Sequence, residues 1–485
     1  MSEKTAYVET FGCQMNVLDS ELVIGRLRQM GYALTEDMNQ ADLALLNTCS
    51  VRQHAEEKVY SRLGQLGRAK RDRPGMVIGV IGCMAQRDPD AIVRAMSHVD
   101  LVCGPGRLAE LPELIRQVER NGRRATLVSD MTALRRQGRE AASDDLLEQL
   151  DMCRDVDSGA ATAFVRIQRG CDKFCSFCIV PYVRGPEQSR PPANIVEETK
   201  LLADAGIRQV TLLGQTVNSY HYRDGGRSVR LPELLARVHE VAGIDRIRFV
   251  TSYPGDFDVD ILHAMRDLPK VCEYLHMPAQ SGSDRMLEAM RRHYTVGQYD
   301  ELIGRAREIV PDISLAGDFI VGFPGETEDD FQATCELVQR TRYKNIFVFR
   351  YSPRPGTTAD RKLGDEVPLE VKRRRNAELL KIQQQISLEQ NRAMIGQRVE
   401  VLVEGYSPAA RKARRQQQAG HDAAAWRDPT QLTGRTRGDQ IVVFDGSERL
   451  VGELAEVTVT DATALTLHGQ PVGPGQLSDC AVRPR

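Results

Sequence analysis

Apolar residues in the first quarter of the chain alternate between short strand-like runs and longer amphipathic helical patterns. Strand patterns cover residues 7–11, 41–47, 76–82 and 99–102, and helical patterns cover 19–30 and 54–69. Strands that alternate with helices are typical of a mostly parallel sheet with helices packed on both faces. We therefore predict a doubly wound α/β domain over residues 4–120.

The alternation resumes after a charged segment at residues 120–160, which carries no strand pattern and is predicted to be a connector. Six strand patterns then follow, separated by helical ones, at residues 163–167, 210–213, 247–250, 272–276, 315–321 and 345–350. Six strands are too few to close an eight-stranded barrel. The pattern predicts a partial (β/α)6 TIM-like barrel over residues 157–390, which includes most of a long polar helix at 366–395.

From residue 397 the apolar residues alternate with period two, and glycines separate the short runs. This pattern is typical of a small β-barrel, predicted over residues 392–470 and interrupted by an insert at 407–432. Basic side chains gather in the insert and in the strand after it: Arg411, Lys412, Arg414, Arg415, Arg435 and Arg437. Such a run is usually a solvated face, but on a small β-barrel it also fits an RNA-phosphate surface.

Composition narrows the class of protein. The 485 residues are 41% hydrophobic and 27% charged, as in globular proteins, and the net charge of -2 gives no overall attraction to nucleic acid. The chain shows no apolar run of membrane-spanning length and no secretory h-region, so a cytoplasmic protein without membrane contact is expected. Eleven cysteines in a reducing compartment indicate metal binding or catalysis rather than disulfides.

Three of these cysteines are spaced C-x3-C-x2-C directly after the strand pattern at 163–167: Cys171, Cys175 and Cys178. A structural zinc site usually has four protein ligands in paired units, and no fourth cysteine or histidine is close by in the sequence. Three thiolates suit a 4Fe-4S cluster whose fourth iron stays open, as in a catalytic site. A three-ligand zinc loop is the alternative.

One more cysteine follows each of the first three strand patterns: Cys13, Cys49 and Cys83. The carboxyl ends of parallel strands share one edge of the sheet, so these thiols are expected to converge on a second three-cysteine cluster. The alternative is that they are ordinary buried cysteines at strand ends. We interpret Cys103 as structural and Cys153 as incidental.

The loops that follow the strands of the partial barrel are rich in glycine, proline and small polar residues. In barrels of this type the loops at the carboxyl ends of the strands carry the chemistry, and glycine lets the backbone approach a ligand closely. A ring of such loops fits a nucleoside-bearing cofactor, for which the candidate residues are Gly214, Gln215, Gln280, Ser281, Gly322 and Glu326.

The cysteine motif resembles the signature of the radical S-adenosylmethionine (SAM) enzymes, and the whole chain resembles the methylthiotransferases. The segments similar to the bacterial tRNA-modifying branch are TFGCQMNVLDSE (10–21), NTCSVR (47–52), GCDKFCSFCIVPYVRG (170–185), QSGSDRML (280–287), DFIVGFPGET (318–327) and YSPRPGT (351–357). LTGRTRGDQIVVF (432–444) is similar to the TRAM domain, an RNA-binding barrel, although the insert departs from its usual compact pattern.

The resemblance implies that Cys171, Cys175 and Cys178 hold a 4Fe-4S cluster that cleaves SAM to a 5′-deoxyadenosyl radical. It also implies that Cys13, Cys49 and Cys83 hold an auxiliary 4Fe-4S cluster that carries or donates sulfur. The substrate would be tRNA, in which a methylthio group replaces the hydrogen on carbon 2 of N6-isopentenyladenosine beside the anticodon. The six loop residues would then line the SAM pocket, and Arg435 and Arg437 would contact RNA. An electron donor such as flavodoxin or ferredoxin and a sulfur source would be partners of a monomeric enzyme.

Three other functions compete with this one. A methylthiotransferase for a ribosomal-protein aspartate would keep all six cysteines, but that branch typically reads Cys-Pro-Lys-Asn where this chain has Cys-Gln-Met-Asn at 13–16. A methylthiotransferase for threonylcarbamoyl-adenosine in tRNA is a closer rival to the favoured function than the ribosomal-protein enzyme. A non-catalytic zinc and RNA-binding module is the third, and bound iron with SAM cleavage would eliminate it.

Overall fold

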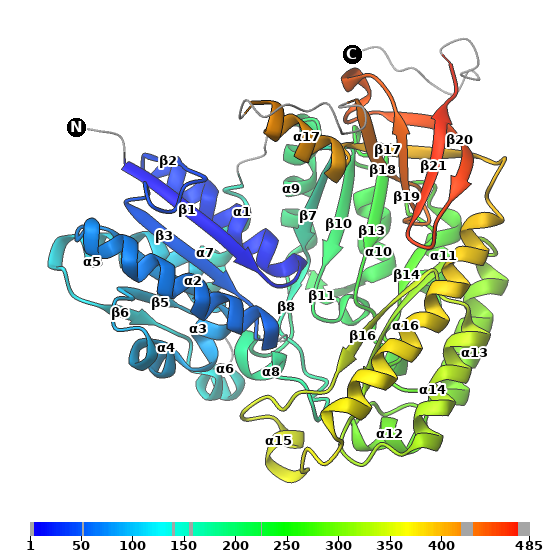
Figure 1. Ribbon diagram of the computed structural model, residues 1–485, viewed down its shortest axis with the longest axis horizontal. Coiled ribbons are helices and arrows are strands. Elements are labelled where there is room, and N and C mark those ends of the chain that lie inside the picture. The colour runs from blue at the N-terminus through cyan, green and yellow to red at the C-terminus, as the bar shows by residue number, and fades with distance from the viewer. Residues whose placement is uncertain are drawn as a thin grey trace.

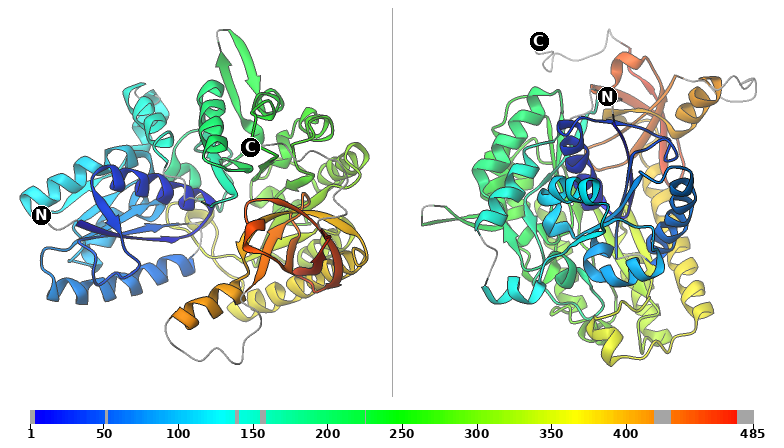
Figure 2. Two further views of the ribbon diagram at one scale, coloured as in Figure 1. Left: turned by 90° about the horizontal axis from the view of Figure 1, so that it is seen from above. Right: turned by 90° about the vertical axis from the view of Figure 1, so that its left-hand side faces the viewer.

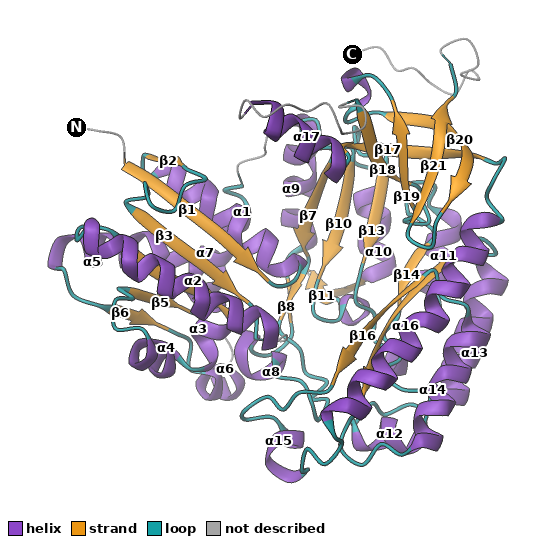
Figure 3. Cartoon of the chain, viewed as in Figure 1, coloured by secondary structure: helices purple, strands orange, loops and turns teal. Residues whose placement is uncertain are grey.

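The chain forms three joined domains in a computed structural model that describes residues 4–50, 53–137, 141–154, 159–224, 226–418 and 430–473. The N-terminal domain lies beside a central partial barrel, and a small closed barrel sits on one end of that partial barrel (Figures 1 and 3). Residues 157–158 at the start of the predicted central domain and 419–429 of the predicted insert lie outside the described ranges. Within those ranges, no helix has both the length and the apolar composition needed to cross a bilayer.

The N-terminal domain is a six-stranded parallel sheet in the order β2-β1-β3-β4-β5-β6. Its strands are β1 (Lys4–Phe11), β2 (Tyr32–Leu34), β3 (Leu43–Thr48), β4 (Val77–Gly82), β5 (Leu101–Cys103) and β6 (Ala125–Leu127), and its helices include α1 (Gln14–Gln29), α2 (Gln53–Asp72), α3 (Cys83–Arg87), α4 (Pro89–Ala95) and α5 (Leu111–Asn121). Helices α1 and α5 pack on one face of the sheet, and α2 and α4 pack on the other. The predicted doubly wound arrangement is confirmed.

Two of these strands were not predicted from the sequence. Strand β2 has only three residues, and β6 lies within residues 120–160, where we expected no strand. That expectation is wrong, because β6 pairs with β5 and extends the sheet by one strand. A three-residue edge strand with a single buried residue, Ala125, is too short to show a period-two pattern. The rest of the connector is helical, in α6 (Met131–Gln137) and α7 (Ala141–Asp151).

The central domain contains the six predicted parallel strands. They are β7 (Thr162–Arg166), β10 (Gln209–Leu213), β13 (Arg246–Phe249), β14 (Tyr274–His276), β15 (Ser314–Val321) and β16 (Asn345–Arg350). They form the sheets β7-β10-β13 and β14-β15-β16, which a single bridge between Ile247 and Val271 joins. The predicted partial (β/α)6 barrel is therefore confirmed. In the view from above in Figure 2, the N-terminal domain lies to its left and the small barrel lies in front of part of it.

Helices surround the outside of this partial barrel and bury its apolar outer face. They are α9 (Pro192–Asp204), α10 (Leu231–His239), α11 (Asp260–Asp267), α12 (Asp284–Ala289), α13 (Val296–Ile309), α14 (Glu328–Thr341) and α16 (Leu369–Arg392). The short α15 (Thr358–Lys362) instead packs beside the cysteine loop, where the Ala359 nitrogen donates to the Ser176 oxygen at 2.8 Å. Smaller elements are β8 (Gln168–Arg169), α8 (Val180–Arg184), β9 (Gln188–Ser189), β11 (His221–Asp224) and β12 (Arg227–Arg230). Leu379 and Ile386 anchor the long helix α16 in the main core.

The C-terminal domain is a closed five-stranded barrel in the order β17-β18-β19-β21-β20, which confirms the predicted small β-barrel. Its strands are β17 (Arg398–Tyr406), β18 (Gln431–Arg435), β19 (Ile441–Asp445), β20 (Leu454–Ala462) and β21 (Thr466–Pro471), and the insert begins with α17 (Pro408–Gln418). Alternate residues of β17 and β20, such as Val401, Val403, Val457 and Val459, fill the barrel interior.

The small barrel is attached to the amino ends of the central strands by hydrogen bonds and ion pairs. Arg246, at the start of β13, donates to the backbone oxygen of Arg435 at 2.7 Å and to the Glu400 carboxylate at 2.7 Å. Lys344, just before β16, pairs with Asp439 at 3.0 Å. The Arg246 side chain is 1% exposed although its partner Glu400 is 52% exposed, so the guanidinium itself is buried at this contact and helps to fix the orientation of the barrel.

The N-terminal and central domains meet at a buried cluster of charges. The Asp19 carboxylate of α1 accepts from Arg166 of β7 at 2.7 Å, and Arg166 also donates to Asp151 of α7. Asp151 accepts in addition from Arg169 and lies 3.3 Å from Arg190. Burial alone would raise the pKa of Asp151, but the charges of these three arginines outweigh it and lower the pKa to about 2. The carboxylate is thus ionised and is a shared counter-ion of Arg166, Arg169 and Arg190.

We expect Asp151→Asn to destabilise the protein by about 3–5 kcal/mol, because it removes a negative charge that three buried guanidinium groups share. The measurement is the urea midpoint of unfolding. The matched control is Asp300→Asn, which breaks the exposed Arg340–Asp300 pair and should cost at most about 1 kcal/mol.

The difference in stability between the wild type and Asp151→Asn should also depend on pH. The folded-state pKa of Asp151, about 2, lies below the unfolded value near ~4. The stabilisation is therefore complete above that unfolded value and is lost as the pH falls toward the folded one. An Asp151→Asn protein as stable as the wild type at neutral pH would contradict this role of the charge cluster.

Candidate metal centres and the cavity between the domains

The first cysteine motif lies in the loop that leads from β8 into α8, at the carboxyl end of the central strands. The loop turns sharply at Gly170, whose φ is +75° and where a Cβ would lie 1.9 Å from the Pro186 oxygen, so only glycine fits. Phe174, in the middle of the motif, also has a positive φ of 50°. A hydrogen bond of 3.0 Å from the Cys178 nitrogen to the Cys175 oxygen closes the next turn.

The three thiols of this loop have different neighbours. Cys171 Sγ lies 3.4 Å from Thr216 Oγ1, and burial raises the pKa of the Cys171 thiol to about 11. Cys175 Sγ accepts from Arg292 Nη1 at 3.4 Å. Burial also raises the pKa of Cys178. Because a thiol binds iron as the thiolate, loading of this loop would release protons.

The other three cysteines stand at the carboxyl edge of the N-terminal sheet. Cys13 follows β1, Cys49 follows β3 and Cys83 follows β4. The order of the sheet reverses between β1 and β3, and such a switch point is where open α/β sheets bind ligands. A hydrogen bond with Cys49 and the charge of Arg184 lower the pKa of Cys13 to about 6, although burial opposes them. Arg184 Nε donates to Cys83 Sγ at 3.3 Å.

Asparagine side chains behind this edge hold the first two loops together. Asn16 Nδ2 donates to Asn47 Oδ1 at 3.0 Å, and Asn47 Nδ2 donates to the Asn16 oxygen at 2.8 Å. Cys13 Sγ lies 3.4 Å from Asn16 Oδ1. Asn16 and Asn47 are both 0% exposed, so the pair is shielded from competing water and fixes the loop after β1 against the end of β3.

Each set of three cysteines offers the ligands that an iron–sulfur cluster uses, with one iron left open. In the described part of the chain, no three His, Cys, Asp or Glu side chains are arranged around a single metal ion. In a 4Fe-4S cluster each thiolate binds a different iron, so the sulfurs need not converge on one point. The chemistry of both donor sets fits such clusters, and the six cysteines stay predictions as ligands.

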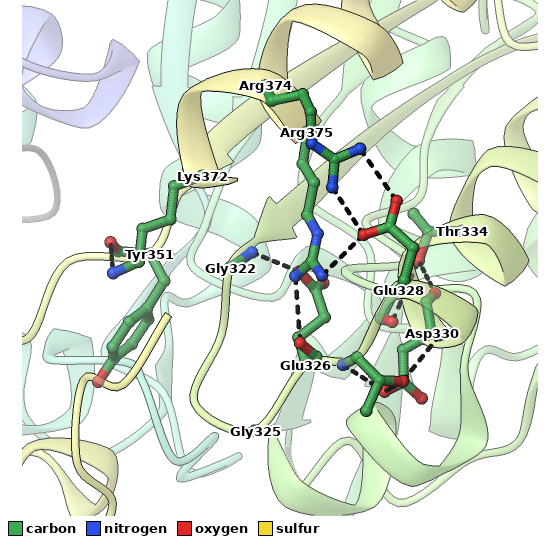
Figure 4. Close-up of polar contacts among 12 residues, drawn as sticks. Gly322, Gly325, Glu326, Glu328, Asp330, Thr334, Tyr351, Lys372, Arg374 and Arg375 are labelled. Carbon is green, nitrogen blue, oxygen red and sulfur yellow. Dashed lines mark hydrogen bonds and ion pairs between the residues drawn. The ribbon is translucent and has the colours of Figure 1, made fainter. Parts of the chain in front are cut away.

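The predicted cofactor loops all lie at the same end of the barrel as the cysteine motif. Gly214 and Gln215 follow β10, Gln280 and Ser281 lie beyond β14, and Gly322 and Glu326 lie beyond β15. Glu326 accepts from the Gly322 nitrogen at 2.6 Å and from Arg375 of α16 at 2.7 Å. Figure 4 draws both contacts as dashed lines. The Glu326 side chain is 1% exposed, so its carboxylate shapes the loop. A cofactor contact from these six residues stays a prediction.

The loop beyond β14 is tied to the neighbouring strand. Gln280 has a φ of +74°, its nitrogen donates to the Asp318 oxygen at 2.8 Å, and its oxygen accepts from Ile320 at 3.0 Å. Ser281 Oγ lies 3.3 Å from Thr334 Oγ1. A non-glycine residue with a positive φ costs free energy, and here the two backbone bonds hold it in place.

A cavity of about 1470 Å³ connects the N-terminal thiols, the inside of the partial barrel and the C-terminal barrel. Cys13 and Cys49 line one part of it. Aromatic residues that line it are Phe164, Tyr274, Phe347, Phe349 and Tyr406, and polar ones include Arg248, His276, Asp318, Lys344, Arg411, Arg435 and Asp439. His276 Nε2 lies 3.5 Å from the Asp318 carboxylate in this lining. The cavity thus combines apolar rings, hydrogen-bonding groups and cations.

The two arginines predicted to contact RNA differ in their surroundings. Arg435 lines the cavity and pairs with Asp439 at 3.0 Å and with Glu404 at 3.4 Å. Arg437 is held by Glu273 of the central domain at 2.6 Å and helps to attach the barrel. The exposed Arg411 of α17 also lines the cavity, and Arg414 lies 3.9 Å above the Tyr406 ring.

Sequence reasoning missed the arginines that contact the thiols. Arg184 closes an apolar stretch at 179–183, where a lone cation is a weak sign of a buried partner. Arg292 is flanked by Arg291 and His293, so nothing in the sequence distinguishes it from a solvated charge. Both are at most 8% exposed in the structure.

Three family models match the chain. The model of the uncharacterized protein family UPF0004 matches residues 5–104, that of the radical SAM superfamily matches 165–338, and that of the TRAM domain matches 423–472. They correspond in order to the three domains described above.

Curated relatives match nearly the whole chain. The chain is 47% identical over 469 residues to a tRNA-2-methylthio-N(6)-dimethylallyladenosine synthase of Rhodopirellula baltica, covering 96% of this chain and 95% of that protein. The protein of the same description from Moorella thermoacetica is 42% identical over 473 residues, covering 97% and 99%. Among solved structures, the radical SAM methyltransferase TsrM of Kitasatospora setae, with cobalamin and a [4Fe-4S] cluster bound, has a TM-score of 0.54 at 16% identity over 74% of each chain. That likeness shows a shared fold.

Gly12 gives a test of the thiol edge. A Cβ at Gly12 would lie 2.5 Å from Cys49 Cβ, and its φ is +145°. We expect Gly12→Ala to separate the loops of Cys13 and Cys49 and to lower the iron content of reconstituted protein by about half, since one of the two predicted clusters would lose its ligand geometry. Gly304→Ala is the control, because no atom lies within 4 Å of that Cβ. Full iron content in Gly12→Ala would contradict the role of this edge.

Proposed function

The chain belongs to the family of the tRNA-2-methylthio-N(6)-dimethylallyladenosine synthases, and on that premise we propose that it methylthiolates tRNA. The family that the sequence motifs indicated is thereby confirmed. The substrate is N6-dimethylallyladenosine, also called isopentenyladenosine, beside the anticodon. The product carries a methylthio group in place of the hydrogen on carbon 2.

The cavity is the observation that carries this proposal. Its volume of about 1470 Å³ exceeds the ~300–1,000 Å³ typical of small-molecule pockets and suits a nucleotide with part of its RNA backbone. Cys13 and Cys49 line it, and the small C-terminal barrel forms another part of its wall. One space therefore adjoins both the proposed sulfur-bearing site and an RNA-binding type of domain.

The lining residues have the properties needed to hold an unstacked base. RNA-binding proteins stack such bases on aromatic rings and hydrogen-bond their edges. Tyr274, Phe347 and Phe349 supply apolar surface for the base and its dimethylallyl group, and His276 and Asp318 supply donors and acceptors for the ring nitrogens. Arg411 and Arg435 lie at the part formed by the small barrel, where we propose that they meet the phosphates. We keep Arg437 as a third proposed RNA contact.

The reaction needs cofactors because no side chain can remove hydrogen from an unactivated aromatic carbon by acid–base catalysis. We propose that Cys171, Cys175 and Cys178 hold one 4Fe-4S cluster and that Cys13, Cys49 and Cys83 hold a second. Bound iron–sulfur clusters and SAM supply the radical and sulfur chemistry, while the protein positions them. The loops with Gly214, Gln215, Gln280, Ser281, Gly322 and Glu326 would form the SAM pocket.

Further requirements follow from this chemistry. Reductive cleavage of SAM needs a one-electron donor, for which a flavodoxin or ferredoxin is suited, and repeated turnover needs a sulfur source. tRNA modification of this kind takes place in the cytoplasm. We propose that the enzyme acts as a monomer.

Replacement of one set of cysteines or of the other should abolish different steps of the reaction. We expect replacement of Cys171, Cys175 and Cys178 by alanine to leave one cluster and to abolish SAM cleavage to 5′-deoxyadenosine. Replacement of Cys13, Cys49 and Cys83 should leave SAM cleavage intact and abolish methylthiolation. The measurements are iron content, with about eight irons in the wild type and about four in each variant, and chromatography of both products.

Cys103→Ala is the matched control, because Cys103 also ends a strand of the N-terminal sheet but its thiol donates to the Gly104 and Arg107 backbone oxygens. That variant should keep both clusters and both products. Methylthiolation by the protein without Cys13, Cys49 and Cys83 would refute the proposed function of the second cluster.

Arg411 should contribute to tRNA affinity through phosphate. We expect Arg411→Ala to weaken tRNA binding and to reduce the slope of log affinity against log salt by about one, because one fewer counterion is released. Fluorescence anisotropy at several salt concentrations measures both. Arg305→Ala, which removes an exposed charge from outer helix α13, should change neither, and an unaltered slope in Arg411→Ala would remove this residue from the RNA interface.

A further inference from the structure

Arg184 connects the two cysteine sites directly. It is the last residue of α8, six residues after Cys178, and its relative exposure is 8%. Its guanidinium donates to Cys83 Sγ at 3.3 Å, to Asn16 Oδ1 at 3.3 Å and to the Asp19 carboxylate at 2.8 Å. All three acceptors belong to the N-terminal domain, so the segment that begins in one cysteine loop ends against the other cysteine site.

Apolar packing holds this segment in place. Ile179 and Val183 of the same segment form a small buried cluster with Cys83, and Tyr182 packs against it. Arg135 holds the front of the loop, with its guanidinium 3.0 Å from the Asp172 carboxylate and 4.5 Å from the Phe174 ring. The position of Arg184 is therefore set by packing as well as by its own polar contacts.

The central cysteine site has an arginine in the same relation to one of its thiols. Arg292 Nη1 donates to Cys175 Sγ at 3.4 Å. The guanidinium is fixed by the Pro278 oxygen at 2.9 Å and by Tyr294 Oη at 3.1 Å, and it lies 4.5 Å from the Tyr253 ring. Among the hydrogen bonds of the described residues, each set of three cysteines thus has a buried arginine that donates to one of its sulfurs.

A buried cation that donates to a cluster ligand acts on the cluster's reduction potential. Reduction adds negative charge, and a nearby positive charge in a medium of low polarity stabilises the more negative state. Hydrogen bonds to ligand sulfurs act in the same direction, and such partners tune metal sites in general. Asp19 offsets part of the charge of Arg184 and orients its Nε toward Cys83.

We propose that Arg184 is a positioning residue that raises the reduction potential of the cluster held by Cys13, Cys49 and Cys83, and that Arg292 does so separately for the other cluster. This inference rests on the proposed function, because it requires that the N-terminal cysteines bind a cluster. On this inference, α8 also connects the two cysteine sites, because the short segment from Cys178 to Arg184 reaches from one site to the other.

The test uses full-length protein in which Cys171, Cys175 and Cys178 are alanine, so that only the N-terminal cluster remains. Potentiometric titration followed by electron paramagnetic resonance measures its potential. We expect Arg184→Gln to shift the midpoint to more negative values. Arg184→Lys, which keeps the charge but not the planar fork, should shift it less. Arg292→Gln should leave it unchanged, since that arginine contacts the other site.

Iron content and thermal unfolding are recorded for every variant. An unchanged midpoint in Arg184→Gln, with full iron content, overturns the inference and leaves the proposed function intact. An equal shift in Arg292→Gln overturns the assignment of one arginine to each cluster. If the starting protein binds no iron at all, the proposed second cluster fails, and the inference fails with it. If Arg184→Gln loses iron, the neutral variant Arg184→Met replaces it in the titration. An unchanged midpoint in Arg184→Met at full iron content also overturns the inference.

Discussion

The buried carboxylate of Asp19 joins the two cysteine-bearing domains. It is 0% exposed and accepts from Arg166 of β7 at 2.7 Å and from Arg184 of α8 at 2.8 Å. Buried charges are costly unless every partner is in place, so this arrangement tolerates only one relative orientation of the two domains. Because Asp19 lies on the helix that begins directly after Cys13, the same interaction sets where the N-terminal thiols stand relative to the barrel.

The residues predicted to carry the chemistry lie at the carboxyl ends of the parallel strands in both domains. Both cysteine sets follow strand ends, and the predicted cofactor loops follow strands of the central domain. Parallel strands present all their following loops at one edge, which is why residues far apart in the chain meet there. The small barrel attaches to the opposite, amino ends through Arg246 and Lys344. The inside of the partial barrel is thereby left open as the space between the small barrel and the N-terminal thiols.

Local pattern was enough to predict much of this structure. The six central strands and the closed barrel have clear periodicity, and strands such as β3 and β4 are buried along their whole length. The edge strands β2 and β6 are too short for a pattern. The charge cluster could not be predicted, because Asp19 and Arg166 are 147 positions apart and nothing local marks them as partners. For the same reason, the attachment of Arg437 to Glu273 emerged only from the structure.

The central claim is that this protein adds a methylthio group to isopentenyladenosine in tRNA. The most direct measurement is mass spectrometry of nucleosides from total tRNA of cells that lack the protein, compared with cells in which the wild-type gene is restored. We expect the deficient cells to lack 2-methylthio-N6-isopentenyladenosine, to accumulate N6-isopentenyladenosine and to regain the product on restoration. An undiminished level of the methylthiolated nucleoside in the deficient cells would contradict the account.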